Sequence, residues 1–199
     1  MKFSRFKALA PAAIALAALI SVAGNVLADV APRVKFATTA GDVTVEVYPD
    51  KAPKTVENFL QYVKEKHYDG TQFHRVIENF MVQGGGYDAN FAEKQTRAPV
   101  VHEGREALAK GGPTNVVGTL AMARTNAPNS ATAQFFINVK DNNFLDPSAQ
   151  QPGYTVFGKV VGGMEVIQKI RTSPTGAGGP FPSDVPKTPI LINSATLVK

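Results

Sequence analysis

The chain has 199 residues, of which 44% are hydrophobic and 19% charged, and this composition excludes a disordered protein. It contains no cysteine, which excludes disulfides, a thiolate nucleophile and a cysteine-ligated zinc site. The net charge is +5, but the chain after position 28 holds 18 basic and 16 acidic residues, and this +2 argues against a nucleic-acid partner.

Residues 1–28 have the pattern of a secretory signal peptide. A short basic stretch precedes an apolar, alanine-rich one, Ala8–Ile20, and small residues at Val26 and Ala28 form a cleavage site. We therefore expect residues 1–28 to be removed, and residues 29–199 to form one domain in a bacterial periplasm, without a stable membrane anchor. The alternative is an uncleaved anchor, because the apolar zone approaches the roughly 20 residues of a spanning helix.

The mature chain is predicted to begin with two strands and a helix. Val34–Thr39 and Val43–Tyr48 flank a short Gly-Asp connection, and apolar and polar residues alternate in the second, which indicates a hairpin. Pro53 then occupies the first turn of a helix that ends near Lys66. Apolar residues at i, i+3, i+4 and i+7 give this helix one buried face. They are Val56, Phe59, Leu60 and Val63.

Short β-like segments dominate the rest of the chain. Met164–Arg171 is predicted to be a second, shorter helix, and residues 176–182 a loop. Because many strands accompany two helices, one near each end, we predict a mainly β fold, a single antiparallel barrel or sandwich. The predicted strands are 72–77, 80–83, 118–123, 134–139, 154–161, 190–192 and 196–198.

The run from Phe73 to Gly85 is the most informative part of the sequence. Arg75 and Gln83 are embedded there among aromatic, Met and Val residues. An arginine is costly to bury without a partner, so Arg75 should lie at the rim of an apolar surface. Such a surface with one cation suits a neutral, partly apolar ligand. The alternative is an amphipathic strand whose arginine merely extends to solvent.

Four later segments complete this pattern: Gly118–Arg124, Ser130–Asn138, Asn143–Asp146 and Tyr154–Val160. Together with F-H-R-V-I-x-x-F-M-x-Q-G-G, they strongly resemble the cyclophilin family of peptidyl-prolyl cis–trans isomerases, over roughly residues 34–198. The Ala-Met-Ala-Arg block and the signal peptide are most similar to exported bacterial members. The resemblance implies a closed eight-stranded antiparallel β-barrel capped by two α-helices, with the site in a groove on its outer face.

The resemblance also implies the residues of the site. Arg75 matches the family's catalytic arginine, and Gln83 a polar group that contacts the substrate backbone; we predict both as catalytic. Phe144 and Tyr154 stand where well-known members carry tryptophan and histidine, and Gly86 where many have aspartate. The predicted substrate-binding residues are Phe80, Met81, Ala123, Arg124, Gln134, Phe136, Phe144, Leu145 and Tyr154.

The three histidines are too scattered in the sequence to indicate a metal site. We interpret His74 as structural, and His67 and His102 as solvent-facing. No metal and no cofactor are expected, because rotation about an amide bond needs neither. That rotation breaks conjugation, at about 18–20 kcal/mol, and a guanidinium aimed at the prolyl nitrogen would stabilise the twisted state more than the planar ones.

We therefore predict a monomeric isomerase that acts on proline-containing peptides and on unfolded exported proteins. The alternative is a non-catalytic, proline-peptide-binding chaperone module. Cyclosporin A should bind weakly, because Phe144 lacks the indole N–H that a tryptophan would offer.

Overall fold

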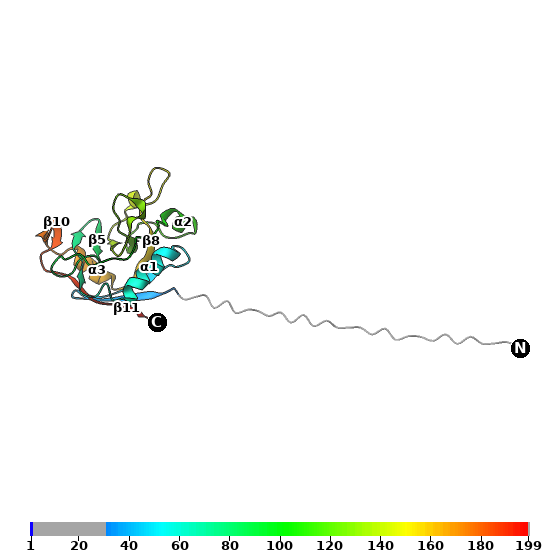
Figure 1. Ribbon diagram of the computed structural model, residues 1–199, viewed down its shortest axis with the longest axis horizontal. Coiled ribbons are helices and arrows are strands. Elements are labelled where there is room, and N and C mark those ends of the chain that lie inside the picture. Colours follow the sequence, from blue (N-terminus) through cyan, green and yellow to red (C-terminus); the bar gives the residue numbers. More distant parts are fainter. Residues whose placement is uncertain (2–30, 199) are drawn as a thin grey trace.

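A computed structural model describes Met1 and residues 31–198 (Figure 1). Apart from Met1, the predicted signal peptide lies outside the described residues. No helix within residues 31–198 is long and apolar enough to cross a membrane. In chain order the elements are β1 (Arg33–Thr38), β2 (Gly41–Val47), α1 (Pro53–Lys64), β3 (Thr71–Gln72), β4 (Arg75–Ile77), β5 (Met81–Gly84), α2 (Gly104–Ala109), β6 (Thr119–Met122), η1 (Pro128–Ser130), β7 (Phe135–Asn138), η2 (Asn143–Leu145), β8 (Val156–Gly162), α3 (Met164–Arg171), β9 (Thr175–Gly178), β10 (Phe181–Pro186) and β11 (Leu191–Val198).

Nine of these strands form one antiparallel sheet, in the order β3-β11-β1-β2-β8-β6-β7-β5-β4. The two edge strands, β3 and β4, are consecutive pieces of one stretch that is interrupted at Phe73 and His74. β3 pairs with β11 and β4 pairs with β5, so the sheet curls until both edges meet in the same stretch of chain. The predicted eight-stranded barrel is thus present in approximate form, with this split strand in the eighth position.

The interior of the barrel is filled by the alternating residues of its strands. In the first hairpin, Val34 lies opposite Val45 and Phe36 opposite Val43, and all four are buried. Figure 1 shows β1 and β11 side by side at the lower edge of the molecule, beside α1. β11 is continuous, whereas two separate strands were predicted. The strand was predicted in two pieces because it contains a bulge, which interrupts the regular pairing. The partner of Ala37 is Ser194, whereas the partner of the next residue, Thr38, is Ile192.

Both predicted helices are present and complete the same core. α1 begins at Pro53, as predicted, and buries Phe59 and Val63 among the barrel residues. α3 adds Ile167 and Ile170 to that core. Burying side chains of this size stabilises the fold by about 1.5–3 kcal/mol each, so the two helices are integral to the domain.

Two predictions about the loops were incomplete. Residues 176–182, predicted to be a loop, belong largely to the β9–β10 hairpin, which turns through Gly179 with a φ of +51°. The ring of Phe181 in this hairpin lies 5.3 Å from that of His74 and 5.2 Å from that of Tyr87. These two aromatic contacts hold the β9–β10 hairpin against the rest of the domain. The short helix α2 was not predicted, since six residues carry too little periodicity to detect.

The prediction that His67 and His102 face solvent was wrong. His67 is buried, and its Nε2 lies 3.1 Å from the carbonyl oxygen of Gly85. His102 is half-buried, and its Nε2 lies 3.1 Å from the carbonyl oxygen of Gly153. Both rings contact backbone far away in the sequence, which no local pattern reveals. Burial lowers the pKa of each.

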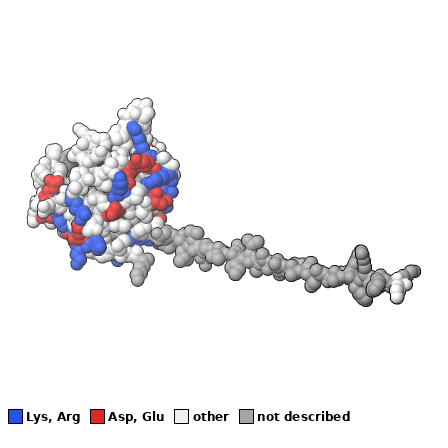
Figure 2. Space-filling view, turned by 45° about the vertical axis from the view of Figure 1, so that its right-hand side comes forward, with Lys and Arg blue, Asp and Glu red and all other residues white. Residues whose placement is uncertain are grey.

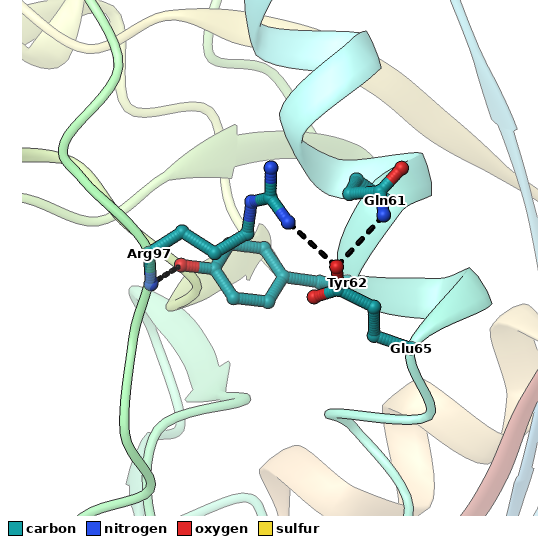
Figure 3. Close-up of polar contacts among 4 residues, drawn as sticks. All are labelled: Gln61, Tyr62, Glu65 and Arg97. Atoms are coloured by element: carbon teal, nitrogen blue, oxygen red, sulfur yellow. Dashed lines mark hydrogen bonds and ion pairs between the residues drawn. The ribbon is translucent and has the colours of Figure 1, made fainter.

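The segment 87–117 is anchored to α1 by polar contacts (Figure 3). The hydroxyl of Tyr62 accepts a hydrogen bond from the backbone N–H of Arg97 at 2.7 Å. Glu65 accepts hydrogen bonds from Arg97 Nη1, at 2.6 Å, and from Gln61 Nε2, at 2.7 Å. The last turn of α1 and the residue that follows it therefore hold this segment at Arg97.

A buried carboxylate makes a second attachment of this segment. Ala52 precedes α1 and offers no capping side chain. Glu103 instead accepts hydrogen bonds from the backbone N–H of Lys54, at 3.1 Å, and of Thr55, at 2.7 Å. These N–H groups would otherwise be unpaired, and a negative charge is favourable at a helix N-terminus.

On the surface, acidic and basic side chains are interspersed over the face in Figure 2.

We predict that protonation of His74 destabilises the protein in mild acid. His74 is 2% exposed, and its Nδ1 is one of two buried side-chain nitrogen or oxygen atoms without a hydrogen-bond partner among the described residues. Burial, together with the charge of Arg75, lowers its pKa from 6.5 to about 4. The unfolded chain therefore binds this proton first, and roughly 3 kcal/mol of stability is lost as the pH falls from 6.5 to 4.

Urea unfolding of wild type and His74→Gln between pH 4 and 7.5 measures this effect. The variant should be less stable at pH 7 but lose less stability on acidification. His102→Gln is the matched control and should remove less of the pH dependence, because His102 is only half-buried. Parallel pH profiles for wild type and His74→Gln would show that His74 is not the titrating group.

Candidate active site

Strand alternation divides the apolar residues of the barrel into two separate clusters. On β5, Val82 faces the interior core while its neighbour Met81 belongs to the second cluster. On β7, Phe135 and Ile137 are in the core, and Phe136 between them is not. The second cluster thus lies on the outer face of the sheet. It comprises Met81, Ala121, Phe136, Leu145 and Val156, with Ile77, Phe80, Ala123 and Tyr154 packed against it.

Cross-strand register brings the polar and apolar parts of this surface together. Arg75 lies opposite Gln83, Gln83 opposite Phe136, and Phe136 opposite Ala121. Paired residues on adjacent strands point to the same face, so one row crosses β4, β5, β7 and β6 outside the barrel. The row begins with a cation, continues with an amide and ends with apolar side chains.

A hollow of about 310 Å³ lies over this row, and we call it the main pocket. Nine of the eleven predicted site residues line it: Arg75, Phe80, Met81, Gln83, Ala123, Arg124, Phe136, Leu145 and Tyr154. The other two lie beside it. Gln134 lines an adjoining hollow of about 320 Å³. Phe144 is 64% exposed, and its ring is stacked on that of Phe80 with centroids 5.8 Å apart, at the rim.

The arginine of the row is held by a chain of neutral amides. Arg75 is half-buried, and its Nη1 donates to Gln83 Oε1 at 3.4 Å; Gln83 Nε2 donates in turn to Gln134 Oε1 at 3.0 Å. None of the ion pairs within residues 31–198 involves Arg75. Its charge is therefore oriented but not neutralised. Gly86 makes room for this chain, because a Cβ there would lie 2.6 Å from the Gln134 side chain.

A second arginine, Arg124, also lines the pocket. Arg124 Cζ lies 4.5 Å from the centroid of the Tyr154 ring, within the range of a cation–π contact. Its Nε and Nη2 donate to the carbonyl oxygen of Gly153, at 3.0 and 2.8 Å. The Tyr154 ring also meets Phe136 edge-on, with centroids 5.5 Å apart. Arg124 was predicted as a substrate-binding residue, and its side chain also fixes a wall of the pocket.

Chemically, the main pocket combines an apolar floor with the guanidinium of Arg75, which is oriented by amides and not paired with an acidic group. Met81 and Phe136 are almost fully buried, and Leu145 forms another wall. Within residues 31–198, no group of three or more His, Asp or Glu side chains converges on a point where a metal ion could bind. The arrangement can hold a small apolar ring and donate hydrogen bonds to an atom that gains electron density beside it.

Comparison with known proteins gives concordant results. A family model described as cyclophilin type peptidyl-prolyl cis-trans isomerase/CLD matches residues 33–197. A protein of Acinetobacter baylyi named peptidyl-prolyl cis-trans isomerase is 48% identical over 185 residues, covering 93% of this chain and 94% of that relative. Peptidyl-prolyl cis-trans isomerase B of Escherichia coli K12 is 50% identical over 167 residues, covering 82% of this chain and 98% of the relative.

Solved structures match the fold. A cyclophilin type peptidyl-prolyl cis-trans isomerase of Cryptosporidium parvum has a TM-score of 0.67 at 23% identity, covering 85% of this chain and 98% of that one. A second structure, described as determined in the presence of the dipeptide Ala-Pro, has a TM-score of 0.66 at 24% identity, covering 84% of this chain and 99% of that one. At this level of identity, the likeness concerns the fold alone.

Proposed function

This chain belongs to the family of cyclophilin-type peptidyl-prolyl cis–trans isomerases, and we propose that it accelerates rotation about Xaa-Pro bonds in exported proteins while they fold. The isomerase class follows from the family. One observation carries the assignment of the site: an arginine without an acidic partner lies at the edge of an apolar pocket. A proline ring is apolar and small, and the amide beside it is neutral, so this substrate suits the pocket.

The chemistry follows from the electronic structure of the amide. In the planar forms the prolyl nitrogen shares its lone pair with the carbonyl, and in the twisted form the lone pair returns to the nitrogen. A guanidinium N–H directed at that nitrogen stabilises the twisted form selectively, which is the condition for faster rotation. We assign this donor to Arg75 and the anchoring of the ring to Phe80, Met81 and Phe136.

The remaining residues would hold the peptide on either side of the proline. Gln83 and Gln134 present amide groups beside the main pocket, and Ala123 and Arg124 continue beyond the end of β6 along its rim. An extended peptide needs backbone partners of this kind. Membership of a family described as peptidyl-prolyl cis-trans isomerases supports the choice of a proline-containing peptide as the ligand.

We predict that Arg75→Ala reduces kcat/KM on an Xaa-Pro peptide by about 10²- to 10³-fold while the protein stays folded, as expected for loss of one preorganised donor. Arg75→Lys should recover little, because an ammonium lacks the fixed fork of the guanidinium. Two-dimensional NMR exchange on Xaa-Pro peptides measures the rate, and circular dichroism the fold.

Arg105→Ala is the matched control, since Arg105 is exposed and lies outside the main pocket. It should retain wild-type turnover. A wild-type protein that binds the peptide without accelerating exchange would favour the non-catalytic chaperone module instead. Full turnover by Arg75→Ala would refute the role of Arg75.

The proposal of export rests on residues 1–28. They combine a basic start, an apolar stretch and small residues before Asp29, and the family model matches only from position 33 onward. We predict cleavage after Ala28 and release into the periplasm. Mass spectrometry of protein purified from a bacterial periplasmic fraction should give a chain that starts at Asp29. A product that retains Met1, or that stays with the membrane fraction, would contradict export by cleavage.

We also predict that cyclosporin A binds weakly and that Phe144→Trp tightens it. Phe144 lies at the rim, where an indole could donate a hydrogen bond that a phenyl ring cannot. One neutral hydrogen bond is worth about 0.5–1.5 kcal/mol, or up to about tenfold in affinity. Peptide turnover should change less, because Phe144 does not line the main pocket. Inhibition constants for wild type and Phe144→Trp that agree within error would exclude Phe144 as the cause.

A further inference from the structure

Three buried asparagines form a connected network beside the main pocket. Asn115, Asn138 and Asn142 are each at most 2% exposed. A carboxamide is costly to bury unless its polar atoms are paired, so such a cluster persists only when it is satisfied. Within residues 31–198, the buried side-chain nitrogen and oxygen atoms without a partner belong to His74 and Arg171, and none belongs to this network.

One end of the network reaches the wall formed by Phe80. Asn142 Nδ2 donates to the carbonyl oxygen of Phe80 at 2.9 Å and to Asn138 Oδ1 at 2.7 Å. Asn138 lies opposite Met81 in the β5–β7 register, next to the pocket floor. Its Nδ2 donates to Asn115 Oδ1, at 3.2 Å, and to Thr119 Oγ1, at 3.0 Å.

The other end reaches the wall formed by Leu145. The backbone N–H and Nδ2 of Asn115 both donate to Asp146 Oδ1, at 2.7 and 2.8 Å, and Asp146 directly follows Leu145. The backbone N–H of Asn142 donates to the carbonyl oxygen of Asn115 at 2.7 Å. The backbone N–H of Leu145 donates in turn to the carbonyl oxygen of Asn142 at 2.8 Å. The turn that carries Leu145 is thus attached at both of its ends.

We propose that Asn142, acting through Asn138 and Asn115, is a positioning residue that fixes the separation between Phe80 and Leu145 and so sets the affinity of the pocket for the proline ring. Phe80 precedes β5, whereas Leu145 lies in η2, and the two belong to distant parts of the sequence. The amide of Asn142 bonds to the backbone of one wall and belongs to the turn that carries the other. Asn142 itself does not line the main pocket.

Loss of Asn142 should change the kinetics differently from loss of Arg75. The ring sits between the walls in the planar and in the twisted state alike, so a displaced wall weakens both states equally. Loss of such uniform binding raises KM and leaves kcat unchanged, whereas loss of a contact specific to the twisted state lowers kcat. The inference rests on the proline-peptide site proposed above.

Asn142→Ala tests the inference, with Asn143→Ala as the matched control. Asn143 is the exposed neighbour in η2. We measure kcat and KM on an Ala-Pro peptide by NMR exchange, and its Kd by NMR titration, at one temperature at which both variants are folded. Asn142→Ala should raise KM and Kd by about three- to tenfold with kcat within about twofold of wild type, and Asn143→Ala should change neither.

A double-mutant cycle separates positioning from general destabilisation. In a Leu145→Ala background, Asn142→Ala should raise KM by less than about twofold further, because the wall that it positions has been removed. If Asn142→Ala does not fold, Asn142→Ser takes its place. Its hydroxyl retains one donor, so the expected rise in KM and Kd is smaller. Unchanged KM and Kd, a fall in kcat alone, or additive effects with Leu145→Ala would each overturn the proposal. Wild-type binding without turnover would refute the isomerase assignment, while the Kd values still test the role of Asn142.

Discussion

Cross-strand register is the constraint on which the site depends, because one sheet must present two different apolar surfaces. Inward residues such as Val82 and Ile137 fill the barrel, and their neighbours Met81 and Phe136 cover its outside. A slip of one residue between β5 and β7 would exchange these sets, emptying the core and burying the pocket floor. The closure of the sheet through the split strand opposes such a slip. If β5 moved along β7, it would either lose its pairing with β4 or carry β4 with it and disturb the pairing of β3 with β11.

The same register accounts for the electrostatics of the row. Arg75 lies at the edge of the sheet, where its guanidinium is half-buried, and its neighbour across the strand is an amide instead of a carboxylate. A carboxylate at that distance would pair with the charge and lower the field that a substrate experiences. Gln83 and Gln134 orient the guanidinium without this loss, and Gly86 leaves the space that Gln134 needs.

Much of this could be predicted from the sequence, for reasons that differ between fold and site. The first hairpin and α1 follow from local periodicity, and Pro53 indicated where the helix begins. The gathering of distant residues around Arg75 could be predicted only through the resemblance of their motifs. The β9–β10 hairpin was missed because Phe181 is held by His74 and Tyr87, which are far away in the sequence. His102 was misjudged for the same reason, since its partner is the carbonyl oxygen of Gly153.

These missed contacts share a physical origin that bears on how the domain works. The barrel strands are fixed by their own ladders, but the rim of the pocket is built from segments that lack regular structure. Side chains that bond to distant backbone hold these segments: Arg124 donates to the carbonyl oxygen of Gly153 and Asn142 to that of Phe80. Such bonds pair backbone groups outside the strand ladders. In the proposed mechanism these bonds do not act on the twisted amide, so they set how tightly a peptide is held, whereas Arg75 sets the rate of rotation. Affinity and rate then depend on separate sets of residues and can change independently.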